Sequence, residues 1–145
     1  METGFEKHLL DGAYNGISQI VKTSLDLQTN IETKDDFGDT ALNKACDQGH
    51  FDIVKLLIER GANINNLGGA DLSPIMNAAT NGYFEITQYL IEKGAEISND
   101  LLSAIQMKVN ILEENAEMGM VNPEGAKAWK QFLEYLISKR KEQES

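Results

Sequence analysis

Apolar and polar positions recur along the first two thirds of the chain with a period of 33 residues. Gly16, Gly49 and Gly82 occupy equivalent positions in three successive copies, and an isoleucine follows each glycine four residues later. A fixed period of this length is typical of stacked repeat proteins, in which each unit packs only against its neighbours. The pattern therefore predicts a linear stack of similar units over this part of the chain.

The central copy, residues 40–64, predicts two antiparallel helices. The first begins at Thr40, which can cap a helix, and ends at Gly49, because glycine adopts the left-handed conformation at a helix end without strain. The second runs from about Phe51 to Arg60 and is apolar over more than half of its circumference, so it needs neighbours on both sides. The apolar positions are Leu42, Ala45 and Cys46 in the first helix, and Ile53, Val54, Leu56, Leu57 and Ile58 in the second.

The N-terminal copy predicts a helix from Gly4 to about Asn15 and a second helix from Ser18 to about Leu27. This second helix has Thr23 and Ser24 where the next copy has two leucines. Polar residues at these positions indicate a terminal repeat with one face toward solvent. The inner side of the first helix carries Leu9, Leu10 and Ala13.

After Ser98 the repeat pattern changes. Apolar residues continue at helical spacing to about Glu117, which predicts a helix longer than the earlier ones. Asn122 followed by proline indicates the start of a last helix, from Pro123 to about Lys141. We expect these two helices to cap the stack. Their apolar stripes are Leu102, Ile105, Val109 and Leu112, and then Ala126, Trp129, Leu133, Leu136 and Ile137.

Residues at many fixed spacings of the repeat match a known pattern. In the central copy they are Asp35, Gly38, Thr40, Leu42, Ala45, Gly49, His50, Ile53, Val54, Leu56, Leu57, Gly61, Ala62 and Asn65, and in the next copy Ser73, Pro74, Ala78, Ala79, Gly82, Ile86, Leu90, Ile91, Gly94 and Ala95. The pattern resembles an ankyrin repeat over about residues 5–98, with Ala41 and Asn43 in place of the usual proline and histidine. The resemblance implies an all-α, ankyrin-repeat-like solenoid of stacked antiparallel helix pairs with short turn fingers.

We expect a single domain over residues 1–145. It comprises an N-terminal capping repeat (1–33), two further repeats (34–66 and 67–98) and a divergent C-terminal helix pair (99–141). Residues 32–39 and 65–72 are polar connections that contain glycine, and they predict two projecting fingers. The second finger is expected to be looser, since Gly68, Gly69 and Ala70 place few restraints on its backbone.

Composition restricts the partner and the compartment. Thirteen basic residues against 23 acidic residues give a formal charge of −10, which repels nucleic-acid phosphates and anionic membrane surfaces. The single cysteine allows no internal disulfide, and no apolar run approaches the roughly 18 residues of a membrane span. We expect a cytoplasmic (intracellular) protein with neither nucleic acid nor membrane as a partner.

The acidic residues do not predict a metal site. Asp36-Phe37-Gly38 spells the magnesium-binding triplet of protein kinases, but the upstream kinase motifs are absent and a turn explains the same residues. The carboxylates of Asp35, Asp36, Asp39 and Asp47 lack the spacing of an EF-hand. We expect them to form a solvated acidic face.

The histidines and the cysteine do not predict catalysis. His50 and His8 have no third ligand at a spacing typical of metal sites, and the resemblance implies that His50 bonds to neighbouring backbone. Cys46 occupies a position that holds alanine in the other copies, which indicates a thiol packed in the core. We therefore expect no enzyme activity, no cofactor and no metal.

Polar residues of varying identity stand at equivalent positions of the first helices, beside the fingers. The resemblance implies that this side is a concave binding surface; the alternative is that these residues are simply exposed. Phe37 lies in a charged turn where burial is hard to arrange, so it is expected to be an exposed anchor unless it folds back onto the turn. The candidate partner-binding residues are Tyr14, Asp36, Phe37, Asp39, Lys44, Asp47, Met76, Asn77 and Thr80.

The function that these features favour is non-enzymatic binding of another protein through the concave face and the fingers. The acidity of the chain suits a partner with a basic surface. Two alternatives remain: an inhibitor or immunity-type protein that covers a basic active site, and a structural subunit of a larger assembly. The chain is expected to be monomeric on its own.

Overall fold

The computed structural model describes residues 4–145 and contains eight α-helices and no strand in that range. The prediction of an all-α fold is confirmed. By contacts, the chain divides into two compact units, one that ends at Ala95 and one from Glu96 to Ser145. The helices are α1 (Gly4–Asn15), α2 (Ser18–Asp26), α3 (Ala41–Gln48), α4 (Phe51–Glu59), α5 (Pro74–Thr80), α6 (Phe84–Glu92), α7 (Asn99–Glu117) and α8 (Pro123–Glu144).

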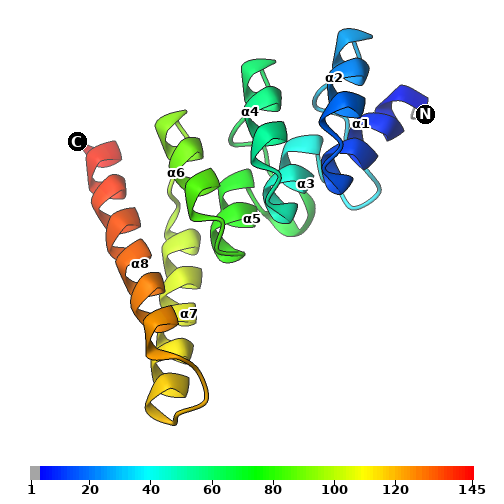
Figure 1. Ribbon diagram of the computed structural model, residues 1–145. Helices are drawn as coiled ribbons and strands as arrows, with labels where there is room; N and C mark the ends of the chain where they lie inside the picture. The colour runs from blue at the N-terminus through cyan, green and yellow to red at the C-terminus, as the bar shows by residue number, and fades with distance from the viewer. Residues whose placement is uncertain (1–3) are drawn as a thin grey trace. The chain divides into compact units, whose positions relative to one another are not determined.

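The first unit is a row of three antiparallel helix pairs, α1–α2, α3–α4 and α5–α6 (Figure 1). Helix α3 packs between α1 and α5, and α2 packs against α4. Local chemistry sets the ends of α3. The Thr40 hydroxyl accepts a hydrogen bond from the Asn43 amide at its start, and Gly49 adopts a φ of 75° at its end, as predicted.

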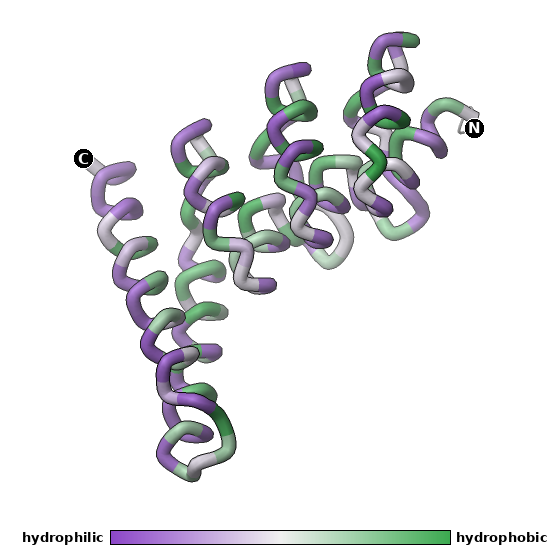
Figure 2. The backbone as a smooth tube through the Cα atoms, in the orientation of Figure 1, coloured by the Kyte–Doolittle hydropathy of each residue, from purple (hydrophilic) through white to green (hydrophobic). Residues whose placement is uncertain are grey.

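The first helix of each pair supplies the centre of this core. The apolar residues on its inner face are fully or almost fully buried, and the tube of each helix alternates between hydrophilic and hydrophobic colours, as expected for helices with one buried face (Figure 2). The predicted inner faces of α1 and α3 are therefore confirmed, and α5 follows the same pattern. The buried residues are Leu9, Leu10 and Ala13 in α1, Leu42, Ala45 and Cys46 in α3, and Ile75, Ala78 and Ala79 in α5.

The second helix of the central pair is less enclosed than its sequence predicts. Ile53, Val54 and Leu57 are buried, but Leu56 and Ile58 are only half-buried. Packing against α3 and α2 covers one side of α4 and leaves the flanks of its apolar face partly open.

The terminal repeat also differs from the prediction. Thr23 is exposed as expected, but Ser24 is only 2% exposed. The exposed apolar position is instead Ile20, whose equivalents Ile53 and Ile86 are buried. Ile20 is open because no helix pair covers that side of α2 within residues 4–95, whereas Ser24 faces the repeat interior.

The second unit is an antiparallel hairpin of α7 and α8, which lie side by side in Figure 1. The Ser98 hydroxyl caps α7 by accepting from the Leu101 amide, and the Asn122 side chain caps α8 by accepting from the Glu124 amide. Helix α8 continues to Glu144, three residues beyond the predicted end. The hairpin core consists of Leu101, Ile105 and Val109 from α7, and Ala126, Phe132, Leu133 and Leu136 from α8.

The buried stripe of α8 is rotated relative to the predicted one. Phe132 is buried, although it is not part of the predicted apolar stripe. Of the predicted residues, Ile137 is exposed and Trp129 is half-buried. The stripe centres near Leu136, and Ile137 follows it by a helical rotation of about 100° away from α7. Trp129 lies at the edge, where the Lys108 ammonium sits 4.3 Å from the centre of its ring.

Candidate functional site

The first finger is a tight turn organised by Asp35. Its carboxylate accepts hydrogen bonds from the amides of Phe37 and Asp39, each at 2.9 Å, and its own amide donates to the Asp39 carbonyl. Gly38 permits the reversal with a φ of 90°. The Phe37 side chain projects from this turn and is 81% exposed, so the alternative in which it folds back onto the turn is wrong.

An ion pair anchors the finger to α3. The Lys44 ammonium lies 2.5 Å from the Asp35 carboxylate and 5.5 Å from the centre of the Tyr14 ring. Burial alone would raise the pKa of Asp35, but the hydrogen bond and charge of Lys44 and the amides of Asp39 and Phe37 lower that pKa below its ordinary value. Asp35 is therefore a structural carboxylate and not part of a solvated acidic face.

The lowered pKa predicts an acid-dependent contribution to stability. Because the folded pKa lies below the unfolded one, the contribution is fully present above about pH 4 and is lost as the pH falls through the folded value. We expect Asp35→Asn to lower the free energy of unfolding at pH 7 by about 1–2 kcal/mol and to flatten its decline below pH ~4. Urea titrations at pH 7, 5 and 3 measure this, with the exposed Asp36→Asn as control. Equal behaviour of the two variants would contradict the role of Asp35.

The second finger is fastened to the first, so the expectation that little holds it is wrong. The Gly69 amide donates to the Asp39 carboxylate at 2.7 Å, and the Gly68 amide donates to the Leu72 carbonyl at 2.8 Å. A Cβ atom on Gly68 would lie 2.5 Å from the Asp39 carboxylate, so only glycine fits there. The glycines that suggested looseness are required for the close approach of the two fingers.

A buried amide network joins the second finger to the helices. The Asn43 side chain, 1% exposed, accepts from the Thr40 amide and hydroxyl and donates to the Leu72 carbonyl and to the Asn77 side-chain oxygen. Asn77 is itself only 7% exposed. The Asn77 side chain is therefore largely buried beneath the fingers, whereas the sequence predicted that it would be exposed.

The two fingers and the inner helices enclose a hollow of about 340 Å³, which we call the finger hollow. It brings together six of the nine candidate residues. The other three lie outside it: Asp36 is exposed elsewhere on the first finger, Met76 is half-buried, and the Thr80 hydroxyl donates to the Met76 carbonyl of its own helix. The finger hollow is lined by Tyr14, Phe37, Asp39, Asn43, Lys44, Asp47, Gly69, Ala70, Leu72 and Asn77.

Four of these lining residues are absent from the candidates chosen by sequence: Asn43, Gly69, Ala70 and Leu72. A signal existed for two of them, since Asn43 replaces the histidine usual in the repeat and a glycine pair often marks close backbone approach. The rim of the hollow is mixed in character. Tyr14 and Phe37 are exposed aromatics, Asp47 is exposed and acidic, and the Lys44 charge is paired with Asp35.

Comparison with known proteins agrees with this architecture. The family described as ankyrin repeats, in three copies, matches residues 9–100. The chain belongs to the ankyrin-repeat family. Ankyrin repeats are commonly protein–protein interaction modules and are typically non-catalytic. A curated relative from Dictyostelium discoideum, the acyl-CoA-binding domain-containing protein 6 homolog, is 44% identical over 50 residues, which is 34% of this chain and 17% of that protein.

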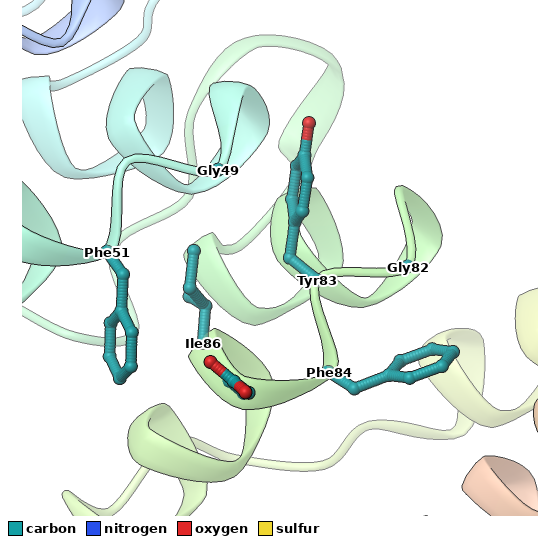
Figure 3. Close-up of a pocket in the computed structure, with 7 residues that line it drawn as sticks. Gly49, Phe51, Gly82, Tyr83, Phe84 and Ile86 are labelled. Carbon is teal, nitrogen blue, oxygen red and sulfur yellow. The ribbon is translucent and has the colours of Figure 1, made fainter.

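A second hollow, of about 330 Å³, lies between the second and third ankyrin repeats, where Tyr83 stands at the position of His50. The Tyr83 ring fills the space beside Gly49, at which a Cβ atom would lie 2.6 Å from the ring. Figure 3 shows that the rings of Phe51, Tyr83 and Phe84 point in different directions, so they form no aromatic cage. Phe51 also packs edge-on against Tyr89. Tyr83 and Phe51 therefore serve packing between the repeats.

The remaining sequence candidates have structural roles in the ankyrin repeats. The His50 Nε2 atom lies 2.9 Å from the Tyr14 carbonyl, which confirms the expected bond to backbone. Cys46 is buried, and burial together with the Asp47 charge raises the pKa of its thiol far above the range of a nucleophile. The prediction of a core thiol is confirmed.

Two other kinds of site are absent from residues 4–145. No cluster of three or more His, Cys, Asp or Glu side chains is arranged to hold a metal ion in this range. Among the helices of the same residues, none combines the length and the hydropathy needed to cross a bilayer.

Proposed function

We propose that this ankyrin-repeat protein binds a partner protein in the finger hollow. The observation that carries the proposal is the 81% exposure of Phe37 on a turn held rigid by hydrogen bonds. A large apolar side chain on a preorganised support is typical of an interface anchor, because little conformational freedom is lost when it is buried. Tyr14 lies across the hollow and supplies a second exposed aromatic residue.

The charges around the hollow suggest which partner surface it accepts. Asp47, which lines the hollow, and Asp36, elsewhere on the first finger, are exposed, and the charge of the lining Lys44 is already paired with Asp35. The net potential at the rim therefore favours lysine and arginine side chains on the partner. Such a distribution accelerates association at low ionic strength more than it increases affinity.

Acyl-CoA binding, which the name of the Dictyostelium relative describes, is not part of the proposal. The shared segment covers 17% of that protein and 34% of this chain. An acidic surface would also repel the phosphates of a coenzyme A ligand.

Partner capture and two substitutions test the proposal. A photo-crosslinking amino acid at position 37 should trap the partner, and the same amino acid at position 5, another exposed phenylalanine in the first unit, serves as the matched control. With the trapped protein in hand, Phe37→Ala should weaken binding by more than about 1 kcal/mol without altering the circular dichroism spectrum, and Phe5→Ala should not. Asp47→Lys should slow association and flatten its dependence on salt.

Unchanged affinity in both Phe37→Ala and Asp47→Lys would remove the finger hollow as the binding site. A sharper form of the proposal, favoured by the net charge of −10, is that the partner is an enzyme or toxin whose basic active site becomes covered. Loss of the captured partner's activity on addition of this protein would support that form. A partner that retains full activity in the complex would exclude it.

A further inference from the structure

Helix α7 carries a row of exposed apolar side chains outside the ankyrin repeats. Met107 and Ile111 of α7, and Met118, which caps its C-terminal end, are between 51% and 65% exposed, and their spacing of four and seven residues places them on one side of the helix. Met120 and Val121 continue the row into the following turn, which has hydrophobic colour in Figure 2. We call these five residues the methionine stripe.

The methionine stripe is not part of the hairpin core. Ile105 and Val109, which face α8, are buried. Met107 and Ile111 each follow them by two residues, a rotation of about 200° around the helix, and therefore point away from α8. Exposed apolar patches of this kind mark interaction sites in soluble proteins. Methionine is suited to such a site because its flexible, polarisable side chain adapts to a partner's surface.

Two carboxylates beside the stripe have no ion-pair partner among the residues that the structure describes. Glu114 lies within the stripe, three residues after Ile111, and Glu117 flanks it; neither forms an ion pair within residues 4–145. The nearby Glu113, in contrast, is paired with Lys130 at 3.0 Å. Lys108 is also turned toward α8, where it lies over the Trp129 ring. The stripe is therefore an apolar row with uncompensated negative charge along it.

We propose that the methionine stripe docks a basic amphipathic helix of a partner protein. A helix with leucine or similar apolar residues on one face, and lysines or arginines beside them, would cover the methionine stripe and form ion pairs with Glu114 and Glu117. A second copy of this chain fits less well, since it would bring the same carboxylates together in a molecule of net charge −10. The site lies beyond residues 9–100, which match the ankyrin family, and does not depend on the finger hollow.

A synthetic peptide of about 18 residues tests this on the full chain. The probe peptide has leucines at helical spacing and lysines at the other positions. One control peptide has the same composition in an order that gives no apolar helix face. A second control has glutamate in place of lysine. We expect the probe to bind at least about 10-fold more tightly than either control. The double substitution Ile111→Gln with Met118→Gln should weaken binding about 10-fold, whereas Leu27→Gln, at an exposed leucine of the first unit, should not.

Non-specific attraction between opposite charges needs its own control. Glu114→Lys with Glu117→Lys should weaken binding about 10-fold, while Glu85→Lys with Glu92→Lys, the same charge change on exposed positions of α6, should have a much smaller effect. Circular dichroism verifies that each variant is folded. Equal losses in the two charge variants, or equal binding of the reordered peptide, would overturn the proposal. So would a dimer in sedimentation that Ile111→Gln converts to monomer, because the occupant would then be a second copy.

Discussion

Replacing Leu57 by alanine is expected to lower the free energy of unfolding by about 2–5 kcal/mol. Leu57 is fully buried on α4, in the middle of the three helix pairs. Its removal loses the transfer free energy of the deleted groups and leaves a cavity that neighbouring repeats fill only in part. Urea unfolding followed by far-ultraviolet circular dichroism measures the change. Leu27→Ala, at an exposed leucine, should cost less than about 0.5 kcal/mol.

The same variant tests whether the C-terminal hairpin caps the repeats. The single tryptophan, Trp129, lies in the second unit, so its fluorescence reports the unfolding of the hairpin. If the hairpin caps the stack, Leu57→Ala should shift the fluorescence transition together with the circular dichroism transition, because neighbouring units of a solenoid unfold cooperatively. A fluorescence transition that stays in place would show that the hairpin unfolds independently.

Replacing Asn43 by leucine is expected to cost about 2–4 kcal/mol. The substitution puts an apolar group of similar size in place of the amide and removes the side chain that bonds to Thr40, Leu72 and Asn77. The polar groups of these three residues then lose a hydrogen bond inside the protein. Losing such a bond lowers the free energy of unfolding more than losing a solvent-exposed one, because water does not replace the missing partner. The exposed Asn15→Leu, which loses one hydrogen bond to the Asp11 carbonyl, serves as control and should change stability little.

A double-mutant cycle separates this network from simple packing. Asn43→Leu and Asn77→Leu should be non-additive, because once the first amide is gone the second has no partner left to lose in that bond. Additive losses would show that the two amides act independently. Asn43→Leu should also weaken partner capture through position 37, if the network holds the second finger against the hollow.

Helix positions were predictable because their ends depend on local chemistry. The predicted helix from Gly4 to Asn15 is observed with those bounds, and Thr40 and Gly49 delimit α3 as expected. The end of α8 was misplaced because Lys141 has no terminating residue after it. Ion pairs of Arg140 with Glu144 and of Lys139 with Glu142 instead support the last turn.

The binding site was predictable only in part. Repeat equivalence and the unusual position of Phe37 identified six residues that line the finger hollow. This reasoning placed Asn77 on the exposed side, because polar residues at variable positions are usually exposed. In the structure, the buried amide of Asn43 on α3 instead donates a hydrogen bond to the Asn77 side chain. The same reasoning missed Asn43 and Gly69, whose roles depend on partners distant in the sequence.

The repeat, most helix ends and the inner core could be predicted from the sequence, since each of these follows from spacings within one copy. Only the tertiary structure shows how the fingers join each other and the helices, because the hydrogen bonds involved connect residues 29, 30 and 34 positions apart. It also decided which apolar residues of α7 remain outside. Periodicity shows that a helix has apolar positions on more than one side, but only the placement of α8 determines which side it covers and leaves Met107, Ile111 and Met118 exposed.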